Sequence, residues 1–353
     1  MKELDNPEIY GKYDPDNMRR HIRDFPELCF RAWQLASEFI LPDNFDNINK
    51  IVILGMGGSA IGGDLVSSLV SNELKIPLVT YRSYQLPAYV DSQTLVIASS
   101  YSGNTEETLT TFTDSLKTGA RHLVITTGGR LKTIAENNGV PVFHFDYKAQ
   151  PRAALPFSLI PILIFLGKLG LVSDKSKDIV ETITILKNLL KQINEGVPFK
   201  NNRAKKLAAD LYCRLPVIYG AEITAEVAHR WKTQLNENGK SWAFHEVFPE
   251  LNHNAVVGYQ IPQEISAKIT VVLLESNLLS EPVKKRFLLT GKLLEKAGVS
   301  YVSIKSFGIS PLSQIMSLIL TGDFVSYFLA ILNKKDPTPV EAIDFLKSKL
   351  SLG

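Results

Sequence analysis

Two short stretches of the sequence place small groups where a strand gives way to a helix, an arrangement suited to binding an anion. The first, residues 49–64 (NKIVILGMGGSAIGGD), has five glycines within nine positions after an apolar run. Glycine permits positive φ and lets a ligand approach the backbone closely. The free amides and the positive dipole end of the following helix favour a negative group. We therefore expect backbone amides and the Ser59 hydroxyl to bind an anion here.

Several interpretations of this loop compete. A dinucleotide site fits the G-x-G-x-x-A pattern of Gly55, Gly57 and Ala60, but needs an acidic residue about 20 positions further on. The next expected strand instead leads into Tyr81 and Arg82. A Walker loop is excluded because no Gly-Lys-Ser/Thr follows. A phosphate monoester and a ligand-free tight corner both remain open.

The second stretch, residues 94–107 (TLVIASSYSGNTEE), favours the phosphate. It carries four hydroxyl side chains at the carboxyl end of a neighbouring strand: Ser99, Ser100, Ser102 and Thr105. Capping of the following helix, by Asn104 or Thr105, explains one or two of these groups but not all four. Neutral hydroxyls and amides suit a phosphate dianion that binds reversibly, without lysine or metal.

The two stretches together resemble the sugar isomerase (SIS) domain. GMGGSAIGGD is followed by SSYSGNTEET, and in SIS proteins the serine- and threonine-rich loop holds the phosphate of a phosphosugar. Matched position by position, the resemblance implies that the phosphate ligands are Gly58, Ser59, Ser100, Ser102 and Thr105.

The composition is that of an ordinary globular protein. A length of 353 residues predicts two domains, and 45% hydrophobic with 21% charged residues is typical of a globular fold. A net charge of +3 is too small to indicate nucleic acid or an anionic membrane as a partner. Cys29 and Cys213 lie in unrelated segments without metal-ligand spacing, which favours a reducing compartment.

The expected location is the cytoplasm. The polar, acidic amino terminus lacks the features of a signal peptide. The apolar region at residues 153–167 is too short to span a bilayer and contains two prolines, so we expect a buried helix there.

Alternating strands and helices predict an α/β fold with two tandem, doubly wound parallel-sheet domains of the SIS type. In the first, strands are expected at residues 51–54, 77–80, 95–98, 123–126 and 142–145. In the second, strands are expected at 217–219, 269–274 and 301–304, and helices at 221–235, 282–297 and 311–332. One N-terminal helix, a bridging helix over 174–202 and a closing helix over 338–350 complete the set.

The corresponding domain boundaries are an N-terminal helical segment (1–45), a first SIS domain with the phosphate loops (46–152), bridging helices (153–204), a second SIS domain (205–335) and a C-terminal helix (336–353). The second domain lacks the dense glycine and serine loops of the first. We therefore expect one phosphate site per chain.

Candidate acids and bases gather in residues 231–257. Glu237 follows a predicted helix in an irregular stretch, and His253 lies between two asparagines. Functional groups are common in such loops, but a loop glutamate or a lone histidine is more often an ordinary surface residue. Residue type alone does not decide between these roles.

A further resemblance assigns them chemistry. RWKTQLNENGK, PELNHNAVVG and DPTPVEAIDFLK resemble the bifunctional phosphoglucose/phosphomannose isomerases, a branch of the SIS proteins, over nearly the whole chain. The resemblance implies that Glu237 removes the C2 proton and that His253, contributed across a homodimer interface, assists ring opening. It also implies that Arg152 steadies the enediolate and that Lys347 takes part in ring opening.

These residue types suit aldose–ketose isomerisation, which requires a carboxylate base, a fixed positive charge and a proton donor. Lys349 competes with Lys347 and Arg130 with Arg152. Thr338 is a candidate for tolerance of either C2 configuration. No metal or other cofactor is expected, since no cluster with ligand spacing is present.

Two other functions remain open. A phosphosugar-sensing regulator would bind without turnover, although the sequence has no helix-turn-helix or basic DNA-binding segment. An isomerase acting on another phosphosugar, such as an amino sugar, would share both phosphate loops.

Overall fold

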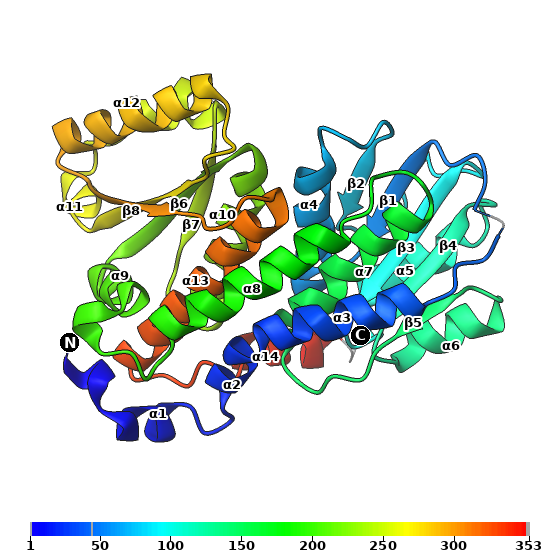
Figure 1. The fold of residues 1–353 in the computed structure, drawn as a ribbon, viewed down its shortest axis with the longest axis horizontal. Helices are drawn as coiled ribbons and strands as arrows, with labels where there is room; N and C mark the ends of the chain where they lie inside the picture. The colour runs from blue at the N-terminus through cyan, green and yellow to red at the C-terminus, as the bar shows by residue number, and fades with distance from the viewer. Residues whose placement is uncertain (1, 44, 351–353) are drawn as a thin grey trace. The chain divides into compact units, whose positions relative to one another are not determined.

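A computed structural model, which describes residues 2–43 and 45–350, shows two compact units, each built around one parallel sheet (Figure 1). The first-sheet unit comprises Asp24–Thr184 and Gly308–Ser313. The second-sheet unit comprises Met1–Arg23, Ile185–Phe307 and Gln314–Gly353. The predicted α/β class with two parallel sheets is confirmed.

The first sheet has five strands in the order β2-β1-β3-β4-β5. Their bounds are β1 (Lys50–Leu54), β2 (Leu78–Tyr81), β3 (Thr94–Ser100), β4 (Arg121–Thr126) and β5 (Val142–His144). All neighbouring strands are parallel, and Leu54 pairs with both Tyr81 and Ala98. The chain leaves β1 and β3 at the same edge, where the strand order reverses, and ligands bind at such a point in open α/β sheets.

Helices cover both faces of this sheet. Apolar side chains of α5 (Glu106–Ser115) and α6 (Gly129–Asn137) share a core with alternate residues of β1, β3 and β4. On the other side α4 (Gly57–Val70), α7 (Leu155–Lys168) and α3 (Phe25–Glu38) pack together, and Phe157 of α7 stacks on Phe145 at 4.5 Å. The close approach of α4 and α7 requires glycine at position 62, because a Cβ there would lie 2.4 Å from the Ser158 carbonyl oxygen.

The second sheet has four strands in the order β7-β6-β8-β9. Its strands are β6 (Leu215–Ala221), β7 (Phe244–Phe248), β8 (Ile269–Glu275) and β9 (Ser300–Lys305). The helices of this part of the chain are α9 (Arg203–Leu211), α10 (Ala225–Glu237), α11 (Gln263–Ser266), α12 (Glu281–Ala297), α13 (Pro311–Leu332) and α14 (Glu341–Leu350). Strand β7 was not predicted, because polar residues interrupt its apolar pattern and much of it is only partly buried.

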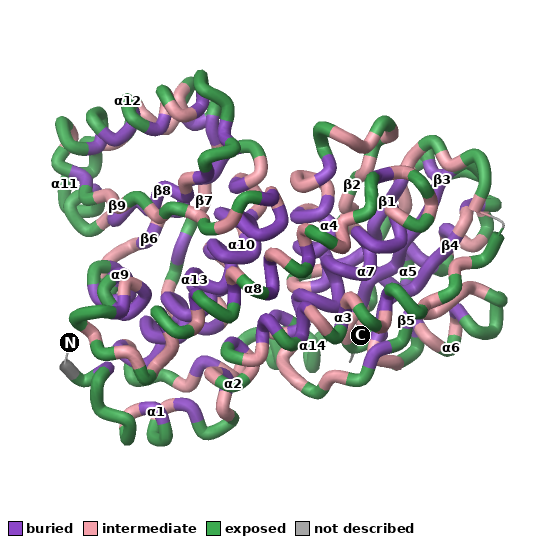
Figure 2. The backbone as a smooth tube through the Cα atoms, in the orientation of Figure 1, coloured by how far each residue is buried: buried purple, intermediate pink, exposed green. Residues whose placement is uncertain are grey.

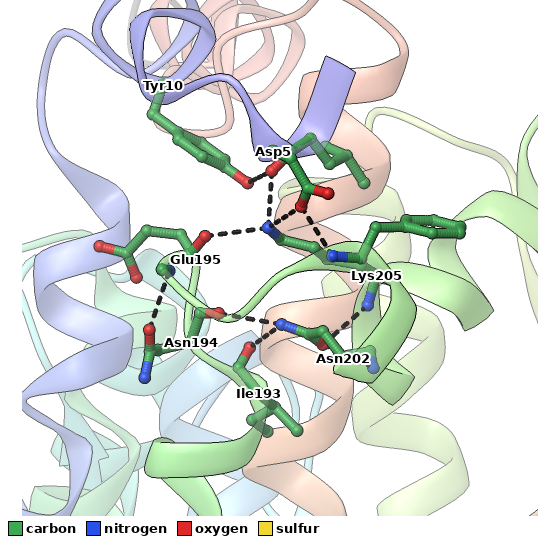
Figure 3. A network of polar contacts seen from close by, with 11 residues as sticks. Asp5, Tyr10, Ile193, Asn194, Glu195, Asn202 and Lys205 are labelled. Carbon is green, nitrogen blue, oxygen red and sulfur yellow. Dashed lines mark hydrogen bonds and ion pairs between the residues drawn. The ribbon is translucent and has the colours of Figure 1, made fainter. Parts of the chain in front are cut away.

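In the N-terminal segment the expected helix corresponds to α3, and two shorter helices that were not predicted, α1 (Pro7–Tyr13) and α2 (Met18–Arg23), precede it. Lys205, whose side chain is 1% exposed, fastens this segment to the second-sheet unit (Figure 3). Its ammonium donates to the Leu4 and Glu195 carbonyl oxygens at 2.6 and 2.9 Å and to the Asp5 carboxylate at 3.0 Å. A buried ammonium requires such partners, which sequence pattern does not reveal.

The bridging helix is shorter than expected. Helix α8 (Ser176–Ile193) ends before Gly196, and the chain then turns into α9, whose N-cap Asn202 accepts hydrogen bonds from the Ala204 and Lys205 amides.

Two apolar helical stretches, Pro151–Lys168 and Pro311–Leu332, are long enough to cross a membrane by length and composition, so the expectation that the first is too short to span a bilayer was wrong. Buried residues make up 72% and 100% respectively of the most apolar 18-residue window of each stretch. Figure 2 marks buried residues in purple. Such burial is typical of core helices, and the buried helix expected at residues 153–167 is confirmed. A cytoplasmic location stays a prediction.

Candidate active site

The loop after β1 is the expected tight turn between a strand and a helix. Helix α4 begins at Gly57, which has a φ of +50°, and its N-cap, Met56, is extended and has no side-chain cap. The Ser59 and Ala60 amides donate to the Met56 carbonyl oxygen at 3.1 and 3.3 Å. The Gly57 and Gly58 amides lie ahead of these first intrahelical hydrogen bonds, where a ligand can meet them. Ser59 is 8% exposed, and its Oγ accepts a hydrogen bond from the Tyr101 amide at 3.0 Å. A hydroxyl can accept and donate at the same time, so the Ser59 hydroxyl can donate a hydrogen bond to a ligand while it accepts one from Tyr101.

The loop after β3 lies against the first. Ser100 is 2% exposed and its Oγ donates to Thr105 Oγ1 at 3.1 Å, while Ser102 is exposed and its Oγ accepts from the Asn104 amide at 3.2 Å. Of the two candidates for the N-cap of α5, Asn104 and Thr105, the structure has Thr105 at that position. Its side chain makes no capping hydrogen bond. Its hydroxyl is therefore available as a donor beside Ser100.

Tyr101 was missed in the sequence, although it stands between two predicted ligands. Its amide joins the two loops through Ser59, and its carbonyl accepts from the Thr127 hydroxyl at 2.6 Å. Its phenol donates to the Tyr147 carbonyl at 2.5 Å and accepts from the Ala149 amide at 2.8 Å. One residue thus links the two loops through its backbone and contacts the segment that precedes Arg152 through its side chain.

Arg152 lies beside the glycine turn. It is 2% exposed, and a Cβ added to Gly58 would lie 3.3 Å from its Cα and 3.2 Å from the Pro151 carbonyl oxygen. The competing Arg130 is exposed on α6, where its amide donates to Asn104 Oδ1 at 3.0 Å. The backbone contact with the glycine turn favours Arg152 as the arginine of this site.

The N-terminal turns of α4 and α5 differ in charge. The first turn of α4, in which every residue is described, contains no acidic side chain, whereas that of α5 contains Glu106 and Glu107. Acidic side chains already occupy the favourable field at the start of α5. The amides of α4 are therefore the stronger attraction for a dianion.

Glu237 belongs to the second-sheet unit and is the last residue of α10, so its prediction as a loop residue was wrong. Its side chain is partly buried. Buried groups hold the helix in place: Gln234 donates to Asp323 at 2.8 Å, and the Trp231 indole donates to the Leu318 carbonyl at 2.9 Å. The carboxylate thus stands at the end of a rigid element, a suitable position for a base.

His253 lies in a short 3₁₀ turn (Glu250–His253) that follows β7, and its side chain is exposed. The neighbouring Asn252 fixes the turn by donating to Thr290 Oγ1 at 2.9 Å and accepting from Arg286 at 3.2 Å. Lys347 and Lys349 are both exposed on α14, and Lys349 lies over the ring of Phe345 at 5.8 Å.

Within the first-sheet unit, the structure therefore brings together Gly58, Ser59, Ser100, Ser102, Thr105 and Arg152 through short chains of contacts. Glu237, His253 and Lys347 belong to the second-sheet unit. The first group can hold an anion, and the second supplies a carboxylate, an imidazole and an ammonium.

The chain is similar to several known proteins. Residues 200–350 match the family model described as the bacterial phospho-glucose isomerase C-terminal SIS domain. A bifunctional phosphoglucose/phosphomannose isomerase of Caldicellulosiruptor bescii is 44% identical over 335 residues, covering 95% of this chain and 99% of that protein. A protein of the same name from Aquifex aeolicus is 36% identical over 301 residues, covering 85% and 90%. The solved structure of a hypothetical protein from Thermus thermophilus has the same fold, with a TM-score of 0.72 at 19% identity over 98% of this chain and 93% of that one.

Proposed function

Since the chain belongs to the bifunctional phosphoglucose/phosphomannose isomerase family, we propose that it interconverts glucose 6-phosphate and mannose 6-phosphate with fructose 6-phosphate. It is a phosphosugar isomerase, and the finer proposal concerns its substrates and its mechanism. The observation that carries the proposal is the pair of hydroxyl-rich loops at the strand-order reversal, joined through the Ser59–Tyr101 hydrogen bond.

The proposed role of these loops is to hold the phosphate. Gly58, Ser59, Ser100, Ser102 and Thr105 offer amide and hydroxyl donors without a lysine among them. Neutral donors bind the dianion reversibly. They contact only the phosphate, and other residues act on the reacting carbons C1 and C2.

In the proposed reaction Glu237 removes the proton from C2 of the open-chain aldose and returns it to C1. The intermediate is a cis-enediolate, whose negative charge Arg152 stabilises because a guanidinium stays protonated throughout. His253 and Lys347 share the proton transfers of ring opening. Glucose and mannose 6-phosphate differ only at C2, so both give the same enediolate. This chemistry requires neither a metal nor an organic cofactor.

The proposed assembly is a homodimer in which His253 reaches the partner's site. Its support is the exposure of apolar side chains close to this residue in sequence: Val257 and Ile261 are 85% and 84% exposed. Large exposed apolar side chains are typical of interaction surfaces. The proposed SIS domains are residues 46–152 and 205–335, and the family match over 200–350 supports the second.

The test offers glucose 6-phosphate and mannose 6-phosphate separately, with fructose 6-phosphate formation coupled to a dye-forming enzyme and no metal added. Comparable turnover of both aldoses supports the proposal, and turnover of one alone removes the second substrate. Binding of fructose 6-phosphate without any turnover favours a regulator.

The same assay in D₂O tests the enediolate. A base that exchanges its proton with solvent introduces deuterium into the product, whereas direct hydride transfer between C1 and C2 introduces none. Glu237→Gln should lower kcat by about 10²- to 10⁴-fold, the range for a missing general base. Glu264→Gln, at an exposed position on α11, is the matched control and should leave kcat unchanged.

A further inference from the structure

The turn that follows Glu237 contains a lysine whose side chain bridges two distant segments. The Lys240 ammonium donates to the Glu237 carbonyl oxygen at 2.6 Å, to the Pro337 carbonyl oxygen at 3.1 Å and to the Pro339 carbonyl oxygen. Pro337 and Pro339 lie just before α14, the helix that carries Lys347. A single cation thus joins the end of α10 to the start of the C-terminal helix.

The turn is shaped for this contact. Gly239 is required because a Cβ there would lie 2.6 Å from the Leu235 carbonyl oxygen. Asn238 is 1% exposed and donates to Ser326 Oγ at 3.3 Å, and Asn333 donates to the Gly239 carbonyl at 2.9 Å. Lys240 itself has a φ of +52°, a conformation that non-glycine residues rarely adopt. The surrounding hydrogen bonds therefore hold a backbone path that local preference disfavours.

The position of the ammonium has an electrostatic reason. The last carbonyl groups of a helix lack intrahelical partners and form the negative end of its dipole, so a cation there is favourable. The carbonyl oxygens before α14 provide further acceptors, and charged donors make stronger hydrogen bonds than neutral ones. One side chain therefore contacts both the backbone of Glu237 and the segment that precedes α14.

We propose that Lys240 is a positioning residue for the isomerase reaction, which orients Glu237 and docks the segment that carries Lys347. This inference rests on the proposed function. Lys240 contacts backbone carbonyl groups and acts through its neighbours, so its removal should disturb proton transfer without weakening the phosphate site of the first-sheet unit.

The first measurement is a kinetic comparison of wild type, Lys240→Met and Lys334→Met. Lys334 is the matched control, because it is an exposed lysine with a similar left-handed backbone, φ +55°. Lys240→Met should lower kcat by about 10- to 100-fold, as expected for a misplaced catalytic group. KM for either aldose phosphate and the inhibition constant of inorganic phosphate should stay within about twofold of wild type. Lys334→Met should match wild type in all three values.

The second measurement is hydrogen exchange of the backbone amides of residues 341–350. Lys240→Met should speed exchange there and leave the first-sheet unit unchanged, whereas a general loss of stability would speed exchange throughout. This readout does not depend on turnover. If wild type converts neither aldose phosphate, the proposed function fails, while the exchange data still report on Lys240.

A chemical rescue separates the ammonium from the fold. Lys240→Cys, made in a Cys213→Ser background because Cys213 is the exposed cysteine and Cys29 is buried, can be aminoethylated to a close analogue of lysine. Treatment should restore most of the lost kcat. Failure of a fully modified, folded protein to recover would overturn the inference, as would unchanged kcat and exchange in Lys240→Met, or a rise in KM alone.

Discussion

The carboxylate of Glu222 accepts hydrogen bonds from the amide of Ser280 at 2.9 Å and from its hydroxyl at 2.6 Å, at the N-cap position of α12. Helix α12 follows β8 in the second sheet, as α5 follows β3 in the first. An acidic side chain of the protein thus occupies a position in the second sheet where an external anion would meet a helix start. This contact gives a physical reason for expecting one phosphate site per chain.

The first prediction is therefore a binding stoichiometry. Wild type should bind one molecule of the non-isomerisable phosphosugar 6-phosphogluconate per chain in calorimetric titration. Glu222→Ala should keep that stoichiometry and kcat. Its free energy of unfolding should fall by about 1 kcal/mol, because the substitution removes the carboxylate that accepts hydrogen bonds at the start of α12. Two equivalent binding events per wild-type chain would contradict this explanation.

The second prediction concerns the contact of Gly58 with the backbone of Arg152. Gly58→Ala places a Cβ 3.2–3.3 Å from Pro151 and Arg152, so this segment must shift by a few tenths of an ångström. We expect the inhibition constant of inorganic phosphate to rise about tenfold and kcat to fall. The reason is that the substitution displaces both the loop that contains Gly58 and the neighbouring Arg152. Gly167→Ala, whose Cβ would meet its nearest neighbour at 3.8 Å, is the control in the same unit. Equal effects of both variants would argue against a phosphate site at Gly58.

The strength of the sequence signal differed between the candidate residues of the two units. The two turns after β1 and β3 were predictable because their glycines and hydroxyls are consecutive in sequence, and one strand-to-helix turn positions each set. Strand β7 was not predictable, because it is an edge strand without clear alternation of apolar and polar residues. The Lys240 contact was not predictable either, because it joins groups about 100 residues apart in sequence. Glu237 was recognisable by resemblance, but helix propensity could not show that α10 continues to it, since Asn236 beside it disfavours helix.

The third prediction is a pH dependence of stability in the first-sheet unit. Lys175 and the backbone of Ser173 donate hydrogen bonds to Glu73 and lower its pKa from 4.5 to about 2. Since the folded pKa is depressed, the stabilisation is complete above pH 4.5 and is lost as pH falls toward 2. The carboxylate is 34% exposed, so solvent screening reduces the stabilisation to about 1 kcal/mol.

Urea unfolding checks this directly. Glu73→Gln should be less stable than wild type at pH 7, and the difference should shrink between pH 4.5 and 2. Glu136→Gln removes a carboxylate from an exposed pair with Lys132 at 3.8 Å and should change stability little at any pH. A difference for Glu73→Gln that stays constant down to pH 2 would show that the carboxylate charge is not its source.

The fourth prediction concerns the partner that contributes His253. If each site combines Glu237 of one protomer with His253 of the other, Glu237→Gln and His253→Ala each inactivate both sites of their own dimer. In a hybrid of the two variants, one site receives both substitutions and the other receives none. A 1:1 mixture that exchanges subunits at random contains hybrids as half of its dimers, so about one quarter of wild-type activity should return.

Subunit exchange must be measured alongside activity, for example by native mass spectrometry of one tagged and one untagged variant. Each variant carried alone through the same exchange procedure should stay inactive. Exposure of His253 and of its apolar neighbours Val257 and Ile261 makes transfer across an interface physically reasonable, since none of these side chains is covered within the chain. Hybrids that form in the expected proportion without regaining activity would show that His253 serves its own chain, whereas full activity of His253→Ala alone would show that it takes no part in the reaction.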